Sequence, residues 1–166
     1  MRGERRVKAK KIAFYGMLVA ISLVLSWVES LIPLNFAVPG IKMGLPNIVV
    51  VFALYRGGFR PAACVSLLRV VLVALLFGNF FAFAYSISGA VLSLCVMQLL
   101  RASNRFGCTG VSVAGAVVHN LAQVIVAVVL LKTVQFAWYF PVLCLSGIVA
   151  GICVGLLSSL LIKRIP

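Results

Sequence analysis

The sequence contains no aspartate and only two glutamates, Glu4 and Glu29. Two carboxylates cannot build the clusters that hold catalytic Mg²⁺ against a diphosphate, and a carboxylate pair for hydrolysis is equally excluded. Charged residues make up only 10% of the chain, whereas a soluble domain needs roughly a quarter to cover its surface. The scarcity of acids therefore excludes a soluble protein and predicts a protein that is not an enzyme and has no catalytic residues.

Cysteine and histidine are also sparse. The five cysteines are scattered singly, without a Cys-x-x-Cys pair, and His119 is the sole histidine. Such a set offers no zinc or haem ligand spacing. We therefore predict no metal site and no cofactor, and the cysteines are interpreted as small apolar residues.

Apolar residues, by contrast, are abundant, at 64% of the chain with a mean hydropathy of +1.22. A membrane-spanning helix needs about 20 apolar residues. The runs predict an all-α integral membrane bundle of six helices after a basic tail at residues 1–11, forming one domain at 12–162. The spans are expected near residues 12–32, 41–55, 60–77, 81–100, 110–131 and 138–162.

Basic residues are distributed unevenly between the two ends of these spans. Twelve of the 15 fall on the side that holds both termini, and only Lys42 and Lys132 fall on the other. Short cytoplasmic loops are enriched in Lys and Arg, so both termini are predicted to be cytoplasmic. The net charge of +13 is thereby explained by membrane orientation, and nucleic-acid binding is not expected.

Arg69 is the fifteenth basic residue, about nine residues into an apolar span. Burying an arginine there costs at least ~2.5 kcal/mol, so it is expected to face the bundle interior and to mark a binding site. A structural arginine bonded to helix carbonyls is the alternative.

A polar group at similar depth lies on the fifth span, where His119, Asn120 and Gln123 share one helix face. At ~1.5 Å per residue, Arg69 and His119 come to the same level of the membrane. The four residues predict a polar cavity, although a network that only holds helices together is equally compatible.

Residues 39–47, PGIKMGLPN, open the second span with two prolines and two glycines. Irregular backbone at membrane depth is tolerated only beside protein or a watery cavity, so Lys42 and Asn47 are further candidates for substrate binding. With residues 33–38 the segment is expected to form a lid; the alternative is a proline-capped helix start with Lys42 at the interface. Glu29 is expected to be an exposed carboxylate at a helix end, with pairing to Lys42 as the alternative.

Small residues recur every third or fourth position on the first and last spans. Such stripes allow another helix to approach closely, inside the bundle or on a separate partner. We therefore interpret them as candidate partner-coupling faces, formed by Ala13, Gly16, Ala20, Gly147, Gly151 and Gly155.

Four ordered motifs resemble the Gx transporter family, which is also described as heptaprenyl diphosphate synthase component I. They are residues 40–47 (GIKMGLPN), Arg69 with the Phe-Gly at 77–78, residues 88–93 (SGAVLS) and residues 115–123 (GAVVHNLAQ). The family is similar to the substrate-binding S components of energy-coupling-factor (ECF) transporters. That similarity implies a site open to the outside of the bacterial cytoplasmic membrane, and coupling to a transmembrane protein and ATPases.

The preferred interpretation is therefore a substrate-binding subunit for uptake of a small anionic or amphipathic molecule, such as a vitamin, flavin, quinone or isoprenoid precursor. The chain has no Gly-x-x-x-x-Gly-Lys-Ser/Thr motif, so ATP-driven steps would belong to partners. The alternative is a non-catalytic accessory subunit of heptaprenyl diphosphate synthase in isoprenoid and menaquinone biosynthesis. A third interpretation, a purely structural subunit, predicts that Arg69 and His119 tolerate substitution.

Overall fold

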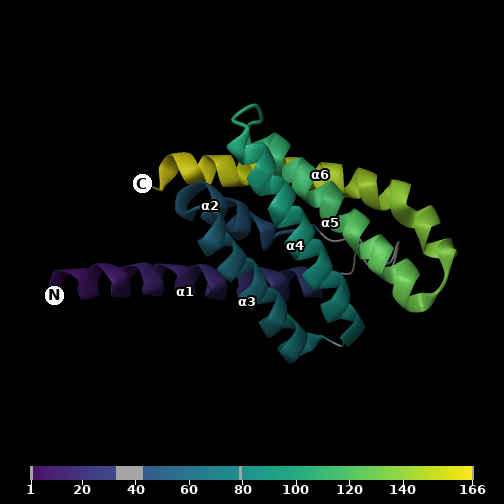
Figure 1. Cartoon of the computed structure of the whole chain (residues 1–166), viewed down its shortest axis with the longest axis horizontal. Helices are drawn as coiled ribbons and strands as arrows, with labels where there is room; N and C mark the ends of the chain where they lie inside the picture. The colour runs from purple at the N-terminus through teal and green to yellow at the C-terminus, as the bar shows by residue number, and fades with distance from the viewer. Residues whose placement is uncertain (1, 33–42, 79, 166) are drawn as a thin grey trace.

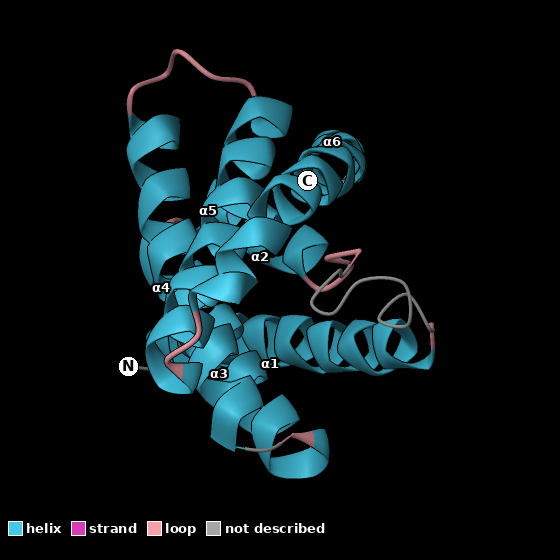
Figure 2. Ribbon diagram, turned by 90° about the vertical axis from the view of Figure 1, so that its right-hand side faces the viewer, coloured by secondary structure: helices cyan, strands magenta, loops and turns pink. Residues whose placement is uncertain are grey.

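A computed structural model describes residues 2–32, 43–78 and 80–165 of the chain. Within these ranges every regular element is a helix, and short loops connect most of the helices (Figure 2). The elements are α1 (Arg2–Leu31), α2 (Asn47–Gly57), α3 (Phe59–Phe77), α4 (Phe80–Ala102), α5 (Cys108–Leu131), the 3-10 helix η2 (Val134–Tyr139) and α6 (Phe140–Arg164).

Five of the helices are long and apolar enough to cross a membrane. The segments that meet this criterion are Ala9–Leu31, Phe59–Leu76, Phe80–Ala102, Cys108–Leu131 and Ala137–Arg164. Their outer faces carry large exposed apolar side chains, among them Leu75 at 77% and Trp138 at 83% exposure. Patches of this kind would be a liability in water and are expected in contact with lipid. The predicted all-helical membrane protein is therefore supported.

The second span was predicted at about residues 41–55, with an irregular start caused by its glycines and prolines. Its helical part, α2, begins at Asn47 and has 11 residues. Gly44 has a φ of +72°, a conformation that glycine tolerates and a helix excludes, and Pro46 follows at the helix start. At 1.5 Å per residue, α2 covers about half of the ~30 Å hydrocarbon core.

α2 forms the centre of the bundle despite its shortness. Six consecutive residues, Val49 to Leu54, are buried, as expected for a helix surrounded on all sides by other helices. It packs against α1, α3 and α6. Near its end, the Arg56 guanidinium donates to the Ile162 carbonyl at 3.1 Å, and Arg101 donates to the Tyr55 carbonyl at 3.3 Å.

The remaining helices form a series of neighbouring pairs: α1 with α3, α3 with α4, α4 with α5, and α5 with α6. α1 begins and α6 ends at the same end of the bundle (Figure 1). The predicted basic tail continues the first helix, since α1 starts at Arg2. The end of α2 thus lies beside the last turns of α4 and α6.

Candidate functional site

A cavity of about 310 Å³ lies inside the bundle and is lined by residues from all six α-helices. This volume is at the lower end of the range for small-molecule sites, roughly 300–1,000 Å³. Five of the six predicted substrate-binding residues line it: Asn47, Arg69, His119, Asn120 and Gln123. The sixth, Lys42, and the expected lid at 33–38 lie outside the described residues. The structure therefore brings together side chains that are up to 76 positions apart.

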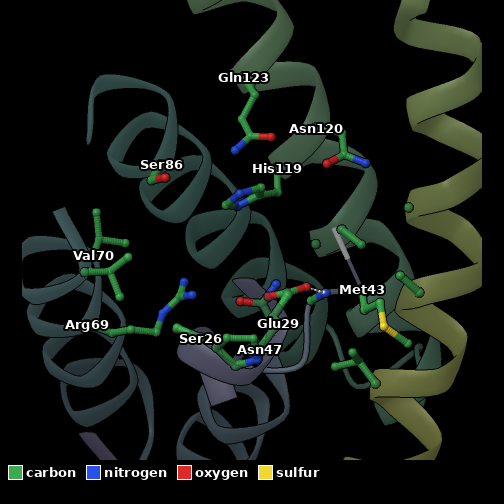
Figure 3. Close-up of a pocket in the computed structure, with 18 of the residues that line it drawn as sticks. Ser26, Glu29, Met43, Asn47, Arg69, Val70, Ser86, His119, Asn120 and Gln123 are labelled. Carbon is green, nitrogen blue, oxygen red and sulfur yellow. Dashed lines mark hydrogen bonds between the residues drawn. The ribbon is translucent and has the colours of Figure 1, made fainter. Parts of the chain in front are cut away.

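Arg69 enters the cavity from α3 (Figure 3). Its Nε is buried and has no hydrogen-bond partner among the described residues. Glu29 lines the same cavity from α1 (Figure 3). A buried donor without a partner is rare and calls for an explanation. The alternative interpretation, an arginine bonded to helix carbonyls, does not account for this nitrogen.

Glu29 lies in the same cavity and corrects the expectation of an exposed carboxylate. It comes from the last turn of α1, is partly buried, and its Oε1 accepts a hydrogen bond from the backbone N–H of Gly44 (Figure 3). Gly44 in turn accepts a hydrogen bond from the Asn47 N–H at 2.9 Å. Glu29 therefore connects α1 to the turn that starts α2, and it brings a carboxylate into the cavity that Arg69 also lines.

The polar group on α5 is split between the cavity and a helix contact. His119 lies against α4, where a Cβ added to Gly89 would come within 2.7 Å of the His119 Cε1. Asn120 turns toward α6, and its Nδ2 donates to the Leu143 carbonyl at 2.7 Å. Gln123 also lines the cavity. Asn120 thus holds two helices together, and each of the two interpretations of this group applies to part of it.

The glycine stripe on α6 is covered by α5 in this structure. A Cβ added to Gly151 would lie 2.7 Å from the Cα of Val113, and one added to Gly155 would lie 2.5 Å from the Cα of Thr109. Gly147 is likewise buried, beneath Asn120. These three glycines therefore serve contact between α5 and α6, and they are not open to a separate partner here.

The stripe on α1 is different. Ala13, Gly16 and Ala20 are all exposed, and a Cβ added to Gly16 would have nothing within 4 Å. Of the two predicted partner-coupling faces, the described residues leave only this one uncovered.

Sequence reasoning missed several other lining residues. Ser26 on α1, Ser86 on α4 and Met43 before α2 all line the cavity (Figure 3). Serines are too common in helices to be singled out from a sequence. Glu29 was identifiable, because an intramembrane arginine usually pairs with a charge of opposite sign, and it is the sole carboxylate near the predicted spans.

The fold and the cavity define a helical membrane protein with charged and polar side chains gathered inside its bundle. The family model for heptaprenyl diphosphate synthase component I matches residues 18–161, and the chain belongs to this family. Neither a curated protein nor a solved structure matches the chain. The expected similarity to ECF S components is therefore not shown by these comparisons.

Proposed function

We propose that this protein is a non-catalytic membrane subunit that binds one small polar or amphipathic molecule in the cavity around Arg69. The observation that carries the proposal is the buried, unpartnered Nε of Arg69 beside a cavity of about 310 Å³. Intramembrane charges are costly and by default mark binding sites or ion pathways. A ligand acceptor at Arg69 would satisfy a donor that the described residues leave without a partner.

The described charges of the cavity refine the expected ligand. Arg69 contributes one positive charge and Glu29 one negative charge. A polyanion such as free diphosphate would be attracted by the first and repelled by the second, since like charges in a site of low dielectric repel strongly. The balance favours a ligand head that is neutral or carries a single negative charge, rather than the strongly anionic ligand that the count of basic residues alone would favour.

Family membership favours a role as the membrane component of heptaprenyl diphosphate synthase. In this role a partner carries out the chemistry, because this chain has no aspartate and only two glutamates with which to hold Mg²⁺. The protein described here would bind or deliver an isoprenoid precursor at the membrane. The family match supports this role more directly than uptake.

Uptake remains the second candidate, favoured by the enclosed position of the cavity among helices that span the membrane. In this role the protein captures a nutrient, and an ECF-type coupling protein with ATPases drives its release. The exposed α1 stripe of Ala13, Gly16 and Ala20 would be the face for the coupling protein.

The test is affinity purification of the tagged protein from its native host in mild detergent, followed by mass spectrometry of associated proteins and extracted small molecules. We expect a small molecule to be retained by the wild type and by Arg60→Gln, which alters an exposed arginine on the same helix. Arg69→Gln should lose it. Equal retention by both variants, or no retained molecule in any sample, would contradict a binding role for the cavity.

The associated proteins separate the two candidates. A prenyl synthase without ATPases would support the synthase component. A membrane coupling protein with ATPases would support uptake and exclude the accessory role.

A further inference from the structure

A second hollow of about 440 Å³ lies between the start of α2 and one face of α6. Its walls are almost entirely apolar, with Met43, Leu45 and Ile48 on one side and residues of α6 on the other. The hydroxyl of Ser146 in its wall donates back to the Leu143 carbonyl at 2.9 Å. This hollow, here called the apolar groove, offers hydrocarbon surface and little for a polar group to bind.

The apolar groove adjoins the polar cavity. Met43, Ala150 and Val154 line both spaces. A Cβ added to Gly44 would lie 3.9 Å from the Val154 side chain, so the start of α2 and α6 come close together where the two spaces meet. The two spaces therefore lie side by side, and a molecule that occupies both has to pass these shared side chains.

The apolar groove also faces outward from the bundle. Leu145 and Val149 in its wall are 64% and 58% exposed, on a helix that is apolar enough to span the membrane. α2 meets α6 at Ser158, whose hydroxyl donates to the Ile48 carbonyl at 3.3 Å. Because α2 begins at Asn47, only one residue before this contact, the helix does not extend over the part of α6 that contains Leu145 and Val149.

We propose that the apolar groove holds the hydrocarbon chain of an amphipathic ligand whose polar head lies in the cavity at Arg69, and that the ligand enters sideways from the bilayer. This inference rests on the proposed function. It is supported by the size of the polar cavity, which suits a head group more than a whole long-chain molecule. A chain gains little by leaving lipid for an apolar wall, so the head should supply the affinity and the apolar groove should fix where the chain lies.

The experiment uses the full-length protein in lipid nanodiscs with farnesoic acid, an isoprenoid chain with a single carboxylate head, that carries a diazirine at the far end of its chain. After irradiation, labelled peptides are mapped by mass spectrometry. We expect label on the α6 face around Leu145 and Val149 in the wild type and in Arg60→Gln. In Arg69→Gln the label there should fall about tenfold or more, the loss expected when one charge-assisted hydrogen bond is removed.

A matched pair of variants tests the apolar groove itself. Val149→Trp places a bulky ring in its wall, whereas Ile152→Trp alters an exposed residue of the same helix that lines neither space. The first should displace the label from α6, and the second should not. If Val149→Trp fails to fold, Leu145→Trp replaces it, because that side chain is also largely exposed.

The outcomes that overturn the inference differ from failure of the proposed function. Label on α6 that is equally strong in Arg69→Gln would mean that the apolar groove only contacts bulk lipid chains. Label that depends on Arg69 but lies elsewhere would place the chain outside the apolar groove while keeping the binding role. Absence of any label that depends on Arg69 would overturn the amphipathic ligand. The binding role itself is tested by the earlier extraction, where equal retention by Arg60→Gln and Arg69→Gln, or no retained molecule in any sample, would contradict it.

Discussion

At the scale of single residues, the charges of Arg69 and Glu29 are the feature on which the proposed binding depends. They come from α3 and α1, and Glu29 also anchors the Gly44 turn at the start of α2. Two opposite charges in a bundle interior offset each other's cost of leaving water, so each is expected to be more harmful alone than paired. The pair would thus stabilise the empty cavity as well as orient a ligand head.

A double-mutant cycle with Arg69→Gln and Glu29→Gln measures this coupling. Each single variant leaves one charge without its countercharge, so the double variant should be destabilised by less than the sum of the singles. We expect a coupling of about 0.5–3 kcal/mol in the free energy of unfolding in detergent micelles. Arg60→Gln combined with Glu29→Gln is the control and should be additive, because Arg60 is exposed. Additivity of Arg69 and Glu29 would show that the two charges do not interact.

Gly89→Ala tests the position of the His119 ring. The added Cβ would come within 2.7 to 2.9 Å of three ring atoms, which is closer than real contacts allow, so the ring must move. A side chain moves more cheaply than a backbone, so we expect a clear loss of the retained molecule with little change in the midpoint of thermal unfolding. Gly110→Ala is the control, because its Cβ would meet Phe106 at an ordinary 3.7 Å. Ligand retention that is unchanged in Gly89→Ala would remove His119 from the binding site.

At the scale of helices, the contact between α5 and α6 depends on glycines that no larger residue can replace without moving backbone. Gly155→Ala would bring a Cβ to 2.5 Å from the Cα of Thr109, whereas Gly16→Ala would meet open space. We expect the first to destabilise the protein by about 1–3 kcal/mol through overpacking. The second should be neutral or stabilise by up to about 1 kcal/mol, since alanine favours a helix over glycine. The midpoints of thermal unfolding of both variants, measured in the same detergent, test this difference. Equal midpoints would contradict the close packing of α5 against α6.

The same comparison shows what a sequence can reveal about helices. The long spans were predictable because each is a nearly continuous apolar run of the required length. An irregular segment before α2 was predictable as well, from the glycines and prolines at 39–47, but the residue at which the helix begins could not be read from hydropathy, because it depends on the conformation that Gly44 and Pro46 adopt. Nor could the sequence tell that α5 covers the α6 glycines, because the partner of a small-residue stripe is decided by tertiary packing.

The candidate site was predictable in part for a related reason. Polar residues inside apolar runs are conspicuous, and Asn47, Arg69, His119, Asn120 and Gln123 all line one cavity. Glu29 was assigned to the surface because its place at a helix end hides the fact that α1 directs it inward. Asn120 shows the opposite case. It was predicted to bind substrate, but its amide donates to a carbonyl of α6 and so holds two helices together.

At the scale of the whole molecule, the distribution of charge predicts which end faces the cytoplasm. Arg56 and Arg101 lie at helix ends where their guanidinium groups reach carbonyls of neighbouring helices, and Lys163 and Arg164 end α6 at the end of the bundle where α1 begins (Figure 1). The opposite end carries few basic residues in the sequence. Basic residues in short segments beside spans are retained in the cytoplasm, so this end is expected to lie inside the cell.

Fusions at the C-terminus test this orientation. Green fluorescent protein folds to its fluorescent form in the cytoplasm, and alkaline phosphatase is active only after export, because it requires disulfides that the cytoplasm does not allow. We expect a fluorescent fusion and an inactive phosphatase. Replacing Lys163 and Arg164 by Gln should leave the result unchanged, because the basic residues at the other inner segments still outnumber Lys42 and Lys132. An active phosphatase fusion would reverse the orientation and would place the Glu29 end of the polar cavity on the cytoplasmic half, where a soluble synthase partner could reach it and an external nutrient could not.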